Sequence, residues 1–127
     1  MLCAMSKVFR SRPFSRWMRR AGLTDEALLH AVSEMEQGLV DADLGGGVFK
    51  KRVALPGRGK RAGARTIVAT RMKERWFFLY GFEKNERTNI SSAELKALQE
   101  YAKDLLGLDA AQLAAVVSTG EMTEVVP

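Results

Sequence analysis

The residues best suited to chemistry lie in one basic stretch, residues 50–65, which reads KKRVALPGRGKRAGAR. Seven of its sixteen residues are lysine or arginine, and none is acidic. Apolar residues alternate with polar ones before it, a β-like run at 66–70 follows, and Pro56 and three glycines interrupt its middle. This pattern predicts two strands joined by a basic loop. Cations concentrated at a hairpin favour a polyanionic ligand, with nucleic acid as the first candidate.

Other catalytic chemistries find little support in the sequence. The single histidine, His30, falls opposite the apolar face of a predicted helix, where we expect it to be exposed and structurally neutral. Asp41 and Asp43 could pair as carboxylates, but no histidine, cysteine or clustered acid joins them. The G-x-G-x-x-A pattern at 57–62 precedes a strand rather than a helix, and Arg61 stands where a phosphate-binding P-loop needs Ser or Thr. We therefore expect no metal and no cofactor.

Length and composition predict one domain. The chain has 127 residues, a length that buries roughly two thirds of the surface of its unfolded form. Its one cysteine excludes a disulfide framework and favours the cytoplasm. No apolar run reaches the roughly 18 residues that span a bilayer, and the N-terminus lacks the apolar core of a signal peptide. We expect residues 1–5 and 120–127 to be flexible.

The positive charge is concentrated in two blocks. Residues 1–23 carry six basic residues and no acidic one, and residues 48–75 carry ten basic residues against a single acid. The remaining segments are acidic, so the net charge of +5 understates the contrast. Charge runs of this kind are most often solvated faces. The glycine-rich hairpin in the second block favours nucleic acid instead.

The order of predicted elements indicates an α+β fold with a small antiparallel sheet. A short strand at 7–10 precedes two helices, capped by Ser11 and Thr24, which we expect to form an antiparallel hairpin. Strands follow, of which 76–80 is apolar at every position and is expected to be central. Two further helices begin after Ser91 and Asp109. The order predicts that the helices pack on one side of the sheet.

Several of these stretches together resemble the RelE/ParE toxin superfamily, and within it the RelE-like, HigB-type toxins of bacterial type II toxin–antitoxin modules. The most specific runs are GGGVFKKRVALPGRGKRAGAR and YGFEKNERTNIS, and the resemblance extends over residues 7–108. It implies an α+β toxin that cleaves translated mRNA at the ribosome without a metal and arrests growth. It also implies a cognate helix-turn-helix antitoxin, through which alone the toxin would reach operator DNA.

The resemblance also implies which residues act. The basic active face of the family is matched by five residues: Lys50, Arg52, Arg65, Lys84 and Arg87. Neighbouring cations make a lysine easier to deprotonate, so Lys50 is the candidate for proton transfer, while Arg52 and Arg65 suit the phosphate. The residues expected to bind RNA are Lys51, Arg58, Lys60, Arg61, Tyr80, Phe82 and Asn85, with Tyr80 or Phe82 stacking on a base.

Two departures from the family leave alternatives open. Some HigB toxins use histidines that this chain lacks, and the stacking tyrosine that better-known RelE toxins place near the C-terminus has only Tyr80 and Phe82 as counterparts. Tyr80 and Phe82 could equally be core residues. The alternatives are a gyrase-poisoning toxin of the same fold, a non-catalytic nucleic-acid-binding regulator, and an interaction module for an acidic protein. The regulator lacks a visible recognition helix.

Overall fold

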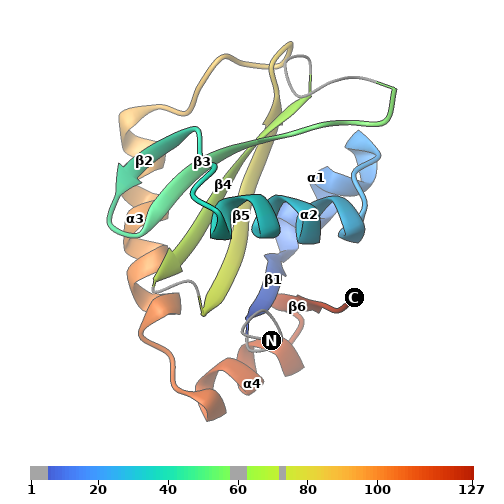
Figure 1. The fold of residues 1–127 in the computed structure, drawn as a ribbon. Helices are drawn as coiled ribbons and strands as arrows, with labels where there is room; N and C mark the ends of the chain where they lie inside the picture. The colour runs from blue at the N-terminus through green and yellow to red at the C-terminus, as the bar shows by residue number, and fades with distance from the viewer. Residues whose placement is uncertain (1–5, 58–62, 72–73) are drawn as a thin grey trace.

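A computed structural model describes residues 6–57, 63–71 and 74–127. These residues form a six-stranded sheet and four helices (Figure 1). The α+β class expected from the sequence is confirmed. In chain order the elements are β1 (Lys7–Ser11), α1 (Arg12–Ala21), α2 (Asp25–Glu36), β2 (Ala42–Gly45), β3 (Val48–Val53), β4 (Ala64–Arg71), β5 (Arg75–Glu83), α3 (Ser92–Leu106), α4 (Ala110–Ser118) and β6 (Met122–Val125).

The sheet is mixed rather than purely antiparallel. Its strand order is β2-β3-β4-β5-β1-β6, and β1 runs parallel to β5 while the other neighbours are antiparallel. The stretch after Gly120, expected to be flexible, instead supplies β6, which pairs with β1 from Val8 to Ser11. Buried Met122 and Val125 anchor this short strand. Strand β1, near the N-terminus, therefore lies between β5 and the C-terminal strand β6.

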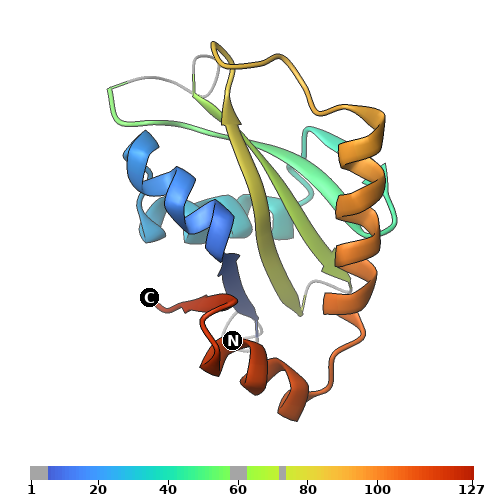
Figure 2. The same ribbon diagram turned by 180° about the vertical axis from the view of Figure 1, so that it is seen from behind.

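Helices cover both faces of the sheet, which corrects the expectation that they pack on one side. Helices α1 and α2 share one core with Val53, Val68 and Phe78, and α3 and α4 share the other with Ile67 and Phe77. Figure 1 shows α2 in front of the sheet, and Figure 2 shows α3 across the opposite face. The physical reason lies in β5, whose apolar residues point to both sides and require cover on each.

Capping residues set the limits of the helices as the sequence predicts. The hydroxyls of Ser11 and Thr24 accept hydrogen bonds from Phe14 and Ala27. Ser91 and Glu94 form a complete capping box at the start of α3. Helices α1 and α2 both pack on the sheet, α1 against β5 and α2 against β3, and their antiparallel pairing stays a prediction. Among the described residues, no helix combines the length and the apolar character needed to cross a bilayer.

Candidate functional site

Strand register brings the predicted cations into two rows across β3, β4 and β5. Arg52 lies opposite Arg65, which lies opposite Phe82. One step along the same face, Lys50 lies opposite Ile67, which lies opposite Tyr80. Ile67 and Phe82 belong to the core beneath α3, so both rows lie on the α3 face. Two arginines directly opposite each other repel, and such a pair is unfavourable for folding.

Asp41, just before β2, offsets part of this repulsion. Its carboxylate accepts hydrogen bonds from the Arg52 backbone nitrogen at 2.6 Å and from Arg52 Nε at 3.0 Å. Partial burial acts to raise the pKa of Asp41, but these hydrogen bonds and the nearby positive charges of Arg52 and Lys51 outweigh it, so the pKa is lowered. Asp41 thus stays ionised and orients Arg52 on the rim of the site.

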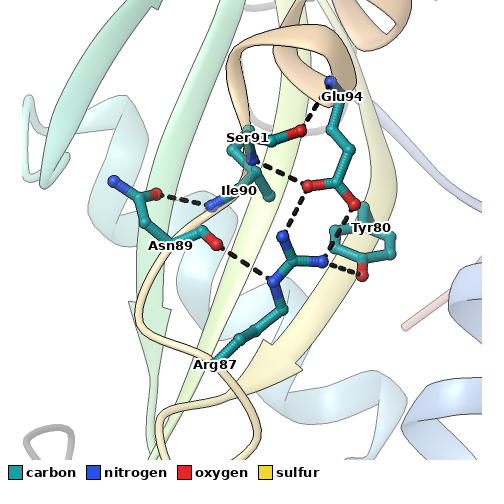
Figure 3. Close-up of polar contacts among 6 residues, drawn as sticks. All are labelled: Tyr80, Arg87, Asn89, Ile90, Ser91 and Glu94. Carbon is teal, nitrogen blue, oxygen red and sulfur yellow. Dashed lines mark hydrogen bonds and ion pairs between the residues drawn. The ribbon is translucent and has the colours of Figure 1, made fainter.

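Tyr80 belongs to a second polar network at the end of β5 (Figure 3). Arg87 Nη1 donates to the Tyr80 hydroxyl at 3.1 Å and to Glu94 Oε2 at 2.9 Å, and Nη2 donates to Glu94 Oε1. Arg87 Nε donates to the carbonyl of Asn89 at 3.0 Å. The guanidinium also lies over the Phe82 ring, 5.8 Å from its centroid. Most of the donors of Arg87 are therefore used within the protein.

The charges of this network reinforce each other. Hydrogen bonds from the Arg87 guanidinium, followed by those from Ser91, lower the pKa of Glu94 to about 2. The hydrogen bond to Glu94, followed by that to Tyr80, raises the pKa of Arg87. Both groups stay ionised at neutral pH, because each stabilises the charged form of the other. This arrangement suits Arg87 to orienting the Tyr80 side chain, because both of its terminal nitrogens already donate to Tyr80 or Glu94 and are not both free for bidentate binding of a phosphate.

A comparison with known protein families finds a match over most of the chain. The family described as "RelE toxin of RelE / RelB toxin-antitoxin system" matches residues 6–125. The chain belongs to the RelE toxin family. It is therefore the toxin of a toxin–antitoxin system, with an antitoxin as partner, and family membership supports ribonuclease activity in general terms. A comparison with curated proteins finds no match.

The structure of this RelE-family toxin removes Lys51 from the site. Lys51 points to the α2 face and is only 4% exposed. Its ammonium lies 2.9 Å from Glu34 Oε1 and donates to the carbonyl of Leu39 at 2.9 Å. A buried, paired lysine is not available to an RNA backbone, so the expected RNA-binding role is corrected to a structural one. The alternation of side chains along β3 is the reason, because Lys50 and Arg52 point the other way.

The remaining predicted residues of the toxin differ in exposure. Lys50 and Tyr80 are half-buried, and Lys50 has no ion-pair partner in the part of the chain that the structure describes. Phe82 is 2% exposed, so Tyr80 is the more accessible ring. Lys84 and Asn85 are exposed in the turn after β5. The three predicted RNA-backbone contacts of the hairpin loop, Arg58, Lys60 and Arg61, lie outside the described residues.

Sequence reasoning missed the acidic partners of the site and a set of arginines on α1. Asp41 and Glu94 hold Arg52 and Arg87, and neither pairing was predicted from the sequence. Arg16, Arg19 and Arg20 line a cavity of about 730 Å³ together with Tyr80, Phe82 and Arg87. The sequence signals for these arginines were their i, i+3, i+4 spacing and the absence of acidic residues in the first 23 positions.

Metal-binding groups are not gathered anywhere in the described part of the toxin. No cluster of three or more histidine, cysteine, aspartate or glutamate side chains occurs among those residues. Asp41 is committed to Arg52, and Asp43 accepts a hydrogen bond from the Gly45 backbone at 2.9 Å. The groups on the α3 face that could act on a phosphodiester are therefore side-chain cations and a tyrosine.

Proposed function

We propose that this toxin is a metal-independent endoribonuclease that cleaves translated mRNA at the ribosome and thereby arrests growth. The observation that supports it best is the row in which Arg52 and Arg65 lie directly opposite each other, next to Lys50 on the same face. This placement costs folding free energy through like-charge repulsion. A doubly negative phosphorus transition state is the kind of ligand that such a pair of arginines stabilises.

RNA brings its own nucleophile, so the proposed reaction needs only proton transfer and charge stabilisation. Lys50, in its neutral form, accepts the proton of the 2′-hydroxyl as this oxygen attacks the adjacent phosphorus. The bond from phosphorus to the 5′-oxygen breaks, and the leaving oxygen takes a proton from solvent. The products are a 2′,3′-cyclic phosphate and a 5′-hydroxyl end. Arg52 and Arg65 stabilise the negative charge on the phosphorus oxygens throughout.

The aromatic residue at the end of β5 supplies the other half of the site. Tyr80 lies in the row of Lys50, and its hydroxyl is held by Arg87. We propose that the ring stacks on a base splayed out next to the scissile phosphate. Lys84 and Asn85, exposed in the following turn, are placed to contact the backbone of the same strand.

The partner that neutralises the toxin is proposed to be a helix-turn-helix antitoxin with an acidic segment. The basic face offers it an electrostatically complementary surface, and a protein of net charge +5 associates fast with an acidic partner. Binding should therefore weaken between low and moderate salt. An association that is independent of salt would exclude an electrostatic interface.

The deciding experiment compares ribosome-bound with free mRNA. Purified toxin is mixed with one mRNA, either alone or on programmed ribosomes, and the ends are mapped by primer extension. We expect cleavage within the decoded codon on ribosomes and little cleavage of the free message. In cells, amino-acid incorporation should stop before DNA synthesis after induction. Continued protein synthesis together with a DNA damage response would support the gyrase-poisoning alternative.

A further inference from the structure

The cavity beside α1 lies where β5 loses its strand neighbour. The pairing of β1 with β5 ends where Arg10 lies opposite Phe78. Beyond Arg10, strand β1 leads into α1, whose N-cap is Ser11 (Figure 2). The end of β5 therefore faces a helix instead of a strand. Trp17 packs so closely on Gly81 that a Cβ there would lie 2.3 Å from the indole ring. The cavity, of about 730 Å³, lies within the range of roughly 300–1,000 Å³ of binding pockets.

Three exposed arginines form one wall of this cavity, and no ion pair within the described part of the protein accounts for them. Arg16, Arg19 and Arg20 follow the i, i+3, i+4 spacing that puts them on one face of α1, opposite buried Phe14 and Met18. Like charges at i and i+4 repel each other. Arg19 and Arg20 gain from the negative end of the helix dipole, but Arg16 lies a turn earlier. None of the three has a carboxylate partner among the residues described.

The cavity also adjoins the candidate active site. Tyr80, Phe82 and Arg87 line it, and Tyr80 ends the row that begins at Lys50. An RNA strand with a base stacked on Tyr80 would therefore pass next to the arginines of α1, which line the same cavity. Guanidinium groups match phosphate with paired donors, and single strands are bound by grooves that combine cations with aromatic rings. Glu86 is the one acidic residue among those lining the cavity.

From these observations we propose that Arg16, Arg19 and Arg20 form a phosphate-binding wall for the RNA strand that passes Tyr80. The ligand is an RNA backbone, and the continuity with Tyr80 favours the message over ribosomal RNA. The proposal deepens the proposed function by giving the toxin a second contact with RNA, on an element outside the sheet. It concerns binding and not the chemical step.

The test measures RNA binding separately from cleavage. A short single-stranded RNA with 2′-O-methyl groups, which lacks the nucleophile, is titrated with the parent and with the triple variant Arg16→Gln, Arg19→Gln, Arg20→Gln at several salt concentrations. Each phosphate contact to a single strand contributes about 0.7 to the slope of log affinity against log salt. We therefore expect weaker binding and a slope reduced by about two. A charge-matched control carries Lys7→Gln, Lys96→Gln and Lys103→Gln, three exposed lysines away from this cavity.

Further measurements separate the possible ligands. Loss of affinity for the oligonucleotide places the message in the cavity, whereas a loss confined to vacant ribosomes places ribosomal RNA there, and both support an RNA site. The proposal is overturned if both affinities equal those of the parent, if the control loses as much as the variant, or if only binding of an acidic antitoxin segment falls.

Single-turnover cleavage with saturating toxin keeps this proposal distinct from the proposed function. The triple variant should cleave the bound message at the parental rate. A Lys50→Ala protein should bind the 2′-O-methyl oligonucleotide with parental affinity and should cleave the message slowly. A Lys50→Ala protein that cleaves normally would refute the assigned catalytic site and leave the arginine wall standing. Equal thermal midpoints for variant and parent establish that the helix is intact.

Discussion

Lys50 and Lys51 are adjacent and chemically identical, yet the two faces of β3 give them opposite environments. Lys51 is buried under α2 and paired with Glu34, whereas Lys50 stands on the α3 face beside Arg52 and Arg65. On the first face a cation meets a carboxylate and contributes to folding. On the second, Lys50 lies beside other cations and has no ion-pair partner among the described residues. The difference teaches that charge alone does not mark a functional residue, and that burial and pairing separate a structural lysine from one available to a ligand.

The largest expected effect is on the rate of cleavage, and it concerns the residues on the α3 face of β3 and β4. Replacing Lys50, Arg52 or Arg65 by Ala should lower single-turnover cleavage on saturated ribosomes by about a hundredfold or more, because each removes proton transfer or transition-state charge stabilisation. The matched control is Lys103→Ala, an exposed lysine on α3. Parental rates for all three variants would shift the chemistry to Lys84, Asn85 and Arg87.

The second expected effect is on the stability of the protein, and it concerns Lys51 on the α2 face of β3. Lys51→Met removes the buried ammonium that pairs with the largely buried carboxylate of Glu34, and should lower the free energy of unfolding by roughly 3 kcal/mol. Urea denaturation measures this change. The double variant Lys51→Met, Glu34→Leu should recover much of the loss, since it removes both charges. Cleavage by the folded, ribosome-saturating fraction should stay near the parental rate, and a large fall in rate would break the contrast between the two faces.

A smaller effect on stability should follow from replacing Asp41, the acid that pairs with Arg52. Asp41→Asn removes the charge that offsets Arg52 while keeping an oxygen that can accept from its backbone nitrogen. Because Arg52 is partly exposed, the loss of stability should be about 0.5 kcal/mol. The salt dependence of stability sharpens the result, since unscreened repulsion between Arg52 and Arg65 should be strongest at low salt. A stability difference that is the same at all salt concentrations would argue against the repulsion.

The smallest effect concerns the Arg87–Glu94 pair and its dependence on pH. The folded-state pKa of Glu94 is about 2, below the ordinary value of 4.5, so its stabilising contribution is present above pH 4.5 and is lost as pH falls towards 2. Glu94→Gln keeps a side chain able to complete the capping box but removes the charge. The difference in thermal midpoint between parent and variant should be present at pH 6 and should shrink between pH 4.5 and 2. A constant difference over this range would exclude the ion pair as its cause.

Local signals in the sequence determined a large part of this fold. The caps at Ser11, Thr24 and Ser91 satisfy backbone groups within one turn of the chain, so their residue types alone predict where helices begin. The alternation of side chains along β3 accounts for the observed placement of Lys50 and Arg52 on one face and Lys51 on the other. Hydrophobic periodicity and capping depend on near neighbours, which is why they are readable without a structure.

Long-range pairing decided the rest. The parallel pairing of β1 with β5 and the addition of β6 at the sheet edge join segments that are distant in sequence. The ion pairs with Glu34, Asp41 and Glu94 each connect residues from two different elements or loops. The sheet register set Arg52 against Arg65, and the turn from β1 into α1 brought three arginines next to Tyr80. Sequence alone determined which residues carry charge. Only the tertiary structure decided which of those charges are neutralised, because ion pairing depends on distances that local patterns do not encode.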